Sequence, residues 1–156
     1  MPKARRKRKE ITPHESYIFR IEDWEPSYSF SLNTFRLSRG SYSEHLRVTL
    51  HGVFLAPKKA QDRRASLTIL ASRDEAKALE DSVEYAKPPL AVGSLTIRGA
   101  YTEYLGSMPF DALLGLTQWL SAGKIKMLDL YGDALYRGKA LIRSMRFARD
   151  IDPEDW

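Results

Sequence analysis

The sequence predicts a mainly β protein, either an antiparallel β-barrel or a two-sheet β-sandwich of about seven strands. Apolar and polar residues alternate with a period of two over several segments, as they do on half-buried strands. Turns rich in Gly, Pro, Ser or Asn separate most of these segments. There is no regular strand–helix–strand alternation, which argues against a parallel, doubly wound sheet.

The N-terminal part of the chain contains the first strand signals. Apolar residues alternate with polar ones over Ser16–Trp24, and after Pro26 the alternation resumes over 28–32. At 33–34 the apolar parity slips by one residue, which predicts a bulge. A turn is expected over 38–41.

Glu44–Ala56 is the most regular predicted strand, and Ser66–Ala71 is its expected hairpin partner across a basic loop. His45 and His51 share the polar face of the first of these strands. A metal site is conceivable there, but six residues of extended chain span roughly 20 Å, too far for one ion. We therefore expect a solvated polar face.

Two helices are predicted. Ser72 and Glu75 form a capping box that favours a short acidic helix over about 73–85. A longer amphipathic helix is expected over about 109–122, because Pro109 suits a first turn and Gly123 suits a left-handed stop. We expect it to pack on the sheet through a stripe of five residues at helical spacing: Phe110, Leu113, Leu114, Thr117 and Leu120.

Three further strands complete the count. Leu90–Tyr101 is predicted as one strand in which Gly99 marks a bulge or a close backbone approach. After the long helix, Ile125–Tyr131 and Ala134–Phe147 are predicted as a hairpin. Gly132–Asp133 is the expected two-residue turn between them, because Gly at the first position suits a type II′ turn.

The length of 156 residues predicts a single globular domain over 16–149, between a disordered basic tail over 1–15 and an acidic tail over 150–156. The net charge of +5 is concentrated in the tail. Residues 1–9 hold six basic residues and no acid, whereas the rest of the chain holds 19 basic against 20 acidic residues. A folded basic surface is therefore not required by composition.

Composition and motifs exclude several kinds of function. The absence of cysteine excludes disulfides, thiolate metal sites and a Cys nucleophile, and no apolar run is long enough for a membrane helix. We therefore expect a soluble cytoplasmic protein that binds no membrane. Ser121–Lys124 resembles the end of a phosphate-binding loop, but Ile125 replaces the required Ser or Thr and Gln118 replaces the first Gly.

No metal or cofactor is predicted, since the three histidines lack the spacing of zinc ligands. The sequence contains no recognisable catalytic motif, so a non-enzymatic protein is the expectation. An enzyme whose residues converge only in the folded chain stays open as an alternative.

The leading functional hypothesis is a binding module for nucleic acid or another polyanion. A flexible basic arm would attract phosphates, and a basic stripe on the last strand would orient the ligand, with Lys124 and Lys126 adding to it. The competing interpretation is a solvated tail and a solvated sheet face. The candidate binding residues are Lys3, Arg5, Arg6, Lys7, Arg8, Lys9, Arg137, Lys139 and Arg143.

Two alternatives stay open. The protein could be a self-assembly module and form a homodimer, either through its oppositely charged ends and the acidic residues 74–84 or through exposed strand edges. It could also bind a small molecule in a barrel mouth. The candidate lining of such a mouth is Tyr101, Glu103, Tyr104 and the two strand histidines.

Overall fold

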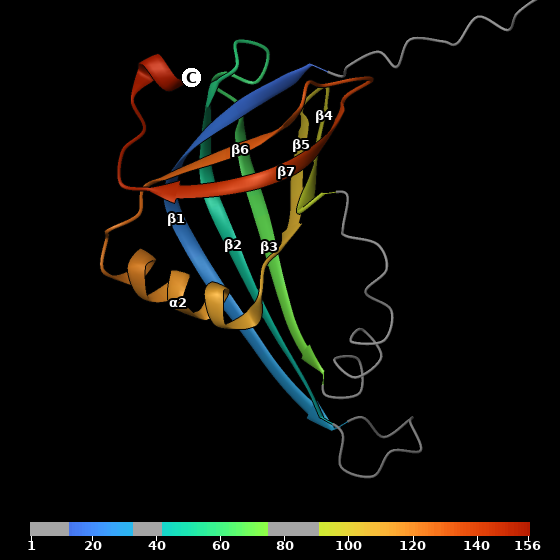
Figure 1. Cartoon of the computed structure of the whole chain (residues 1–156), viewed down its shortest axis with the longest axis vertical. Coiled ribbons are helices and arrows are strands. Elements are labelled where there is room, and N and C mark those ends of the chain that lie inside the picture. Colours follow the sequence, from blue (N-terminus) through green and yellow to red (C-terminus); the bar gives the residue numbers. More distant parts are fainter. Residues whose placement is uncertain (1–12, 33–41, 75–90) are drawn as a thin grey trace, which may run out of the picture.

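The chain forms a closed seven-stranded β-barrel with one α-helix, which confirms the mainly β class and decides for the barrel over the sandwich (Figure 1). This computed structural model describes residues 13–32, 42–74 and 91–156. The predicted bulge at 33–34 and the turn at 38–41 lie outside the described residues. The strands are β1 (His14–Leu32), β2 (Tyr42–Ala56), β3 (Arg64–Asp74), β4 (Gly93–Arg98), β5 (Tyr101–Ser107), β6 (Met127–Asp133) and β7 (Lys139–Ala148).

The order around the barrel is β1-β2-β3-β5-β4-β7-β6, and β6 closes the ring by pairing with β1. β1 pairs with β2 up to its end at Leu32, but it pairs with β6 over His14–Arg20 alone. β1, β2 and β3 therefore extend beyond the closed part of the barrel, as Figure 1 shows below the helix. Pro26 does not interrupt β1, because it lies within the strand opposite Val48.

A sharp bend in β1 allows it to leave β6. The β1–β2 register shifts between Ile21 and Asp23, and at this bend the two strands approach closely at Gly52. A Cβ atom at Gly52 would lie 1.9 Å from the backbone oxygen of Arg20. The close approach therefore requires glycine at this position.

One pair of strands departs from the predicted antiparallel barrel, because β3 and β5 are parallel. The segment Leu90–Tyr101 is also not one strand. Gly99, with φ +56°, lies in a two-residue turn between β4 and β5, so the predicted bulge there was wrong. This hairpin enters the sheet between β3 and β7, which places β5 rather than β4 beside β3.

The predicted turn at Gly132–Asp133 was also wrong. Both residues belong to β6, and a Cβ atom on Gly132 would lie 2.1 Å from the backbone oxygen of Leu141 in β7. The chain turns instead at Arg137–Gly138, where both residues have positive φ, 50° and 77°. A bridge between Tyr136 and Lys139 brackets this turn, in the geometry of a tight hairpin.

The helix α2 (Phe110–Ser121) confirms the predicted long helix, with Pro109 as its N-cap and Gly123 at φ +65° after its end. Its buried stripe differs from the predicted one. Leu116 is buried in place of Leu114, which is 47% exposed. Leu113 and Leu120 stay buried as predicted, and the buried stripe packs on β2 and β3, which the helix contacts from one side.

The predicted acidic helix over 73–85 is wrong in its first two residues, and the remainder lies outside the described residues. Arg73 and Asp74 belong to β3, opposite Glu44 and Ser43 of β2, as does the predicted cap residue Ser72. The capping signal of Ser72 is local, whereas β2 offers a long strand to pair with. The β2–β3 ladder therefore continues through Ser72, and tertiary pairing decides its conformation.

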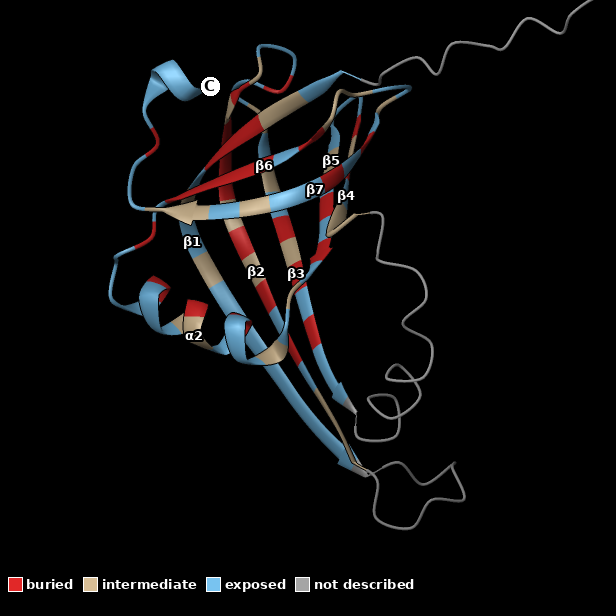
Figure 2. Ribbon diagram, viewed as in Figure 1, coloured by how far each residue is buried: buried red, intermediate tan, exposed pale blue. Residues whose placement is uncertain are grey.

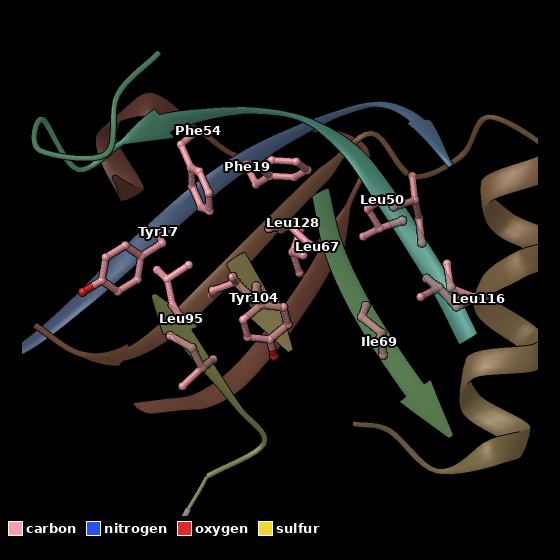
Figure 3. Close-up of a cluster of buried hydrophobic side chains, with 14 of the residues drawn as sticks. Tyr17, Phe19, Leu50, Phe54, Leu67, Ile69, Leu95, Tyr104, Leu116 and Leu128 are labelled. Carbon is pink, nitrogen blue, oxygen red and sulfur yellow. The ribbon is translucent and has the colours of Figure 1, made fainter. Parts of the chain in front are cut away.

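The barrel interior is filled by one cluster of apolar side chains, red in Figure 2 and drawn in Figure 3. Tyr17, Phe19, Phe54 and Tyr104 are its largest fully buried members. A smaller cluster covers the outside of β1 and β6, where Ile151 is buried with Ile18, Ala56 and Met127. The acidic stretch 150–156 therefore packs against the barrel through Ile151, and it includes the 3-10 helix η1 (Pro153–Asp155).

We predict that Gly52→Ala lowers the free energy of unfolding by about 3 kcal/mol, because the new methyl group meets the Arg20 backbone and a strand must shift. Gly115→Ala in α2 is the matched control. Nothing lies within 4 Å of its added Cβ atom, so it should raise helix stability by about 1 kcal/mol. Urea unfolding measures both, and equal effects of the two variants would contradict this account of the bend.

Candidate functional site

A groove of about 1110 Å³ lies on the outside of β4 and β7, and we call it the β4–β7 groove. Leu95 of β4 and Ala140 of β7 are paired and buried in the barrel. Their neighbours along each strand therefore point outward. The lining comprises Pro13, Ser94, Thr96, Arg98, Asp133, Ala134, Leu135, Tyr136, Arg137, Lys139, Ala140 and Leu141.

The turn at Arg137–Gly138 holds one end of the groove in place. The backbone N–H of Ile97 donates to the oxygen of Gly138 at 2.8 Å, which fixes the turn against β4. Tyr136, just before the turn, is 70% exposed, and the Arg137 guanidinium lies 5.3 Å from its ring centre. This is a cation–π distance, so the two side chains form one exposed surface of mixed charge and aromatic character.

Three cationic side chains line the groove: Arg98, Arg137 and Lys139. Within the described part of the chain, none of the three has a carboxylate partner. Several arginines elsewhere on the barrel are paired with carboxylates. For example, Arg64 and Arg20 both bind Glu22, and their hydrogen bonds hold the pKa of that carboxyl below its usual value.

Among the described residues that line the groove, the one acid is Asp133, and its charge is already compensated. Its carboxylate accepts a hydrogen bond from Arg143 Nε at 3.2 Å, and the His14 ring lies 3.8 Å away. Its backbone oxygen accepts a hydrogen bond from the buried Tyr17 hydroxyl at 2.8 Å. The groove therefore keeps an excess of positive charge.

The structure separates the three cations predicted on the last strand. Arg137 lies in the turn and Lys139 at the start of β7, and both line the groove. Arg143 points outward farther along β7, outside the groove lining, with its guanidinium on Asp133. Of the predicted basic stripe, Lys139 and Arg143 do face outward on β7, with the exposed Leu141 between them, whereas Arg137 is not part of the strand.

The other predicted basic residues lie elsewhere. Lys124 and Lys126 are exposed in the connection between α2 and β6 and are not part of the groove lining. The six cations of the tail lie outside the described residues. Pro13, the first described residue, lines the groove, so the N-terminal segment that carries those cations joins the barrel beside the groove.

Tyr101, Glu103 and Tyr104 do not converge on one mouth. Tyr101 and Glu103 are exposed on the outer face of β5, where the hydroxyl donates to the carboxylate at 2.5 Å and the pKa of Tyr101 is raised by this bond. Tyr104 points the other way, into the barrel core. There its ring lies over Gly93 and Gly106, whose added Cβ atoms would reach within 2.4 Å of its hydroxyl.

The two strand histidines stay apart on the polar face of β2, as predicted. His51 bonds Ser66 Oγ through Nδ1 at 2.8 Å and Glu25 through Nε2 at 3.3 Å, and His45 bonds Ser72 at 3.0 Å. These bonds link β1, β2 and β3 across the sheet. No group of three potential metal ligands occurs among the residues that the structure describes.

Comparison of the chain with protein-family models, curated proteins and solved structures finds no match. Within the described ranges, no helix has the length and apolar content to cross a membrane. The candidate site therefore depends on the geometry of the β4–β7 groove itself.

Sequence reasoning missed Arg98 and Tyr136 as groove residues. Arg98 alternates in step with Ser94 and Thr96 along β4, so its side chain is expected to point outward. This could be predicted only once the turn at Gly99 was assigned correctly. Tyr136 required the correct turn. With the turn assigned to Arg137–Gly138, Tyr136 becomes the flanking residue that is exposed beside it.

We predict that the buried tyrosines Tyr17 and Tyr104 stay protonated after the other phenols have begun to ionise. Burial is the main cause that raises the pKa of both, with Glu15 adding to it for Tyr17. Because the folded-state pKa lies above the ordinary value of 10.0, stability is complete below pH 10 and declines as the pH rises further. Ultraviolet titration and alkaline unfolding measure this, and simultaneous ionisation of all eight tyrosines in the folded protein would contradict it.

Proposed function

We propose that this protein is a non-enzymatic module that binds a polyanion in the β4–β7 groove, and that single-stranded nucleic acid is the ligand class that suits the groove best. The observation that supports this most directly is the set of three cations, Arg98, Arg137 and Lys139, without carboxylate partners in the described part of the chain. Neutralising phosphates with such groups releases counterions, which drives association.

The aromatic and apolar part of the lining favours single strands over duplexes. Tyr136 offers an exposed ring beside the Arg137 guanidinium, and unpaired bases stack on such rings. The hydroxyls of Ser94 and Thr96 on the groove floor add hydrogen-bonding groups for phosphate or sugar. A duplex keeps its bases stacked inside and cannot use the ring in this way.

The size of the groove also favours an extended ligand. Its volume of about 1110 Å³ exceeds the upper end, roughly 1,000 Å³, of ordinary small-molecule sites. The chain that carries six basic residues in 1–9 joins the barrel at Pro13 on the groove rim. An arm tethered there adds non-specific attraction where the ligand would lie, as the sequence hypothesis requires.

We predict that Arg137→Gln combined with Lys139→Gln weakens binding of a fluorescein-labelled oligouridylate roughly tenfold, because two phosphate contacts are lost. The slope of log K against log salt should fall by about 2 in magnitude. Fluorescence anisotropy at several salt concentrations measures both quantities.

The matched control is Lys124→Gln combined with Lys126→Gln, which removes the same charge from an exposed segment outside the groove. It should change affinity by less than about threefold, through net charge alone. Equal losses in the two double variants would overturn the groove as the site. Equal affinity for single strands and for inorganic polyphosphate would assign the groove to phosphate alone and remove the base-stacking role of Tyr136.

We predict that deleting Met1–Lys9 lowers affinity more than the groove double substitution does, since it removes six of the protein's cations. The residual binding of the deleted form should still be reduced by Arg137→Gln. Binding that survives the deletion unchanged, or that does not weaken with salt, contradicts a role for the arm.

A further inference from the structure

The edge of β1 that faces away from β2 is a second candidate binding surface. Beyond Arg20, β1 has no strand beside it other than β2 within the described ranges. Figure 1 shows this part of β1 continuing beside β2 past the closed part of the barrel. Residues 25–31 are exposed at every position, so neither face of this segment is covered by a core (Figure 2). This segment is the outer strand of a three-stranded sheet, because β2 pairs with β3 alongside it, and its outer edge is therefore an exposed strand edge.

The hydrogen-bonding direction along this edge follows from the ladder. The backbone of Phe54 in β2 bonds toward β3, through Arg63 and Asp62. Because the bonding direction alternates along a strand, the backbone groups of His45 and Arg47 in β2 bond toward β1. Their register partners there are Ser29 and Ser27. The even-numbered residues of β1 therefore present their backbone groups to the open edge, and Pro26, which has no N–H, is one of them.

Tyr28 and Phe30 thus expose backbone donors and acceptors together with their rings. Their side chains are 57% and 56% exposed, and they contact Phe110 of α2 and Tyr42 of β2 respectively. The stretch 26–32 contains no charged residue. Natural edge strands that avoid association carry charges or bulges, and beyond Pro26 this one has neither.

We propose that two copies of this chain pair antiparallel through the β1 edge, centred on Ser29. In that register Tyr28 lies opposite Phe30 of the second copy, and these residues exchange the backbone hydrogen bonds that the open edge offers. Aromatic rings meet aromatic rings on one face, while serines meet serines on the other. The segment is self-complementary, which makes a second copy the occupant.

Cysteine cross-linking tests this register, because the chain contains no cysteine of its own. Ser29→Cys places two thiols opposite each other in a non-hydrogen-bonded pair, with Cα atoms about 4.5 Å apart, within disulfide range. Ser27→Cys is the matched control on the same face. Its two copies would lie about 14 Å apart, too far to bridge.

Under mild oxidation, Ser29→Cys should convert to disulfide-linked dimer and Ser27→Cys should remain monomeric on non-reducing gels. Equal cross-linking of both variants, or none in either, overturns the proposal. Light scattering supplies an independent readout. The wild-type mass should double with concentration, Ser29→Lys should stay monomeric through charge repulsion at the two-fold axis, and His45→Lys, one strand inward, should still dimerise. A wild-type protein that is monomeric at the highest concentration also overturns it.

Discussion

The structure depends on the short ladder by which β6 closes the barrel against β1. The ladder covers His14–Arg20 and ends where β1 bends at the close approach of Gly52. Above the bend, closure brings Pro13 and Asp133 together at the rim of the β4–β7 groove, where the Ala134 N–H donates to the Pro13 oxygen at 2.8 Å. Below the bend, β1 continues with one edge open. The point at which β6 and β1 stop pairing thus determines the position of both proposed binding surfaces, the β4–β7 groove and the open edge of β1.

Much of the fold was predictable because its strands are half-buried and its sheet interior is continuous. Alternation along β2 correctly separated the buried Leu46, Val48 and Leu50 from the outward histidines. The errors occurred where pairing between distant segments decides the structure. Ser72 favoured a helix cap, but the length of β2 extended β3 past it, and Gly132 suited a turn but serves a close approach to β7. Neither partner strand is visible from local sequence.

The candidate site was predictable to the extent that its residues follow strand parity. Lys139 was placed correctly, whereas the misplaced turn hid Tyr136 and assigned Arg137 to a strand face that it does not share. Arg143 has the predicted exposure, but its pairing with Asp133 was not predictable, because only the folded chain brings the two side chains together. Tyr104 shows the opposite failure. Its neighbours Tyr101 and Glu103 face out while it faces in, so the three could not form one lining.

The central claim, that the β4–β7 groove binds a single-stranded polyanion, is tested most directly by mapping the contact surface in solution. A short oligouridylate would be titrated into isotopically labelled protein while backbone amide shifts are followed by NMR. The account predicts that the largest shifts cluster at Thr96, Arg98 and the segment 136–139, with β2 and α2 unaffected. Shifts centred on α2 or on the outer face of β2, or no shifts at all, would contradict it.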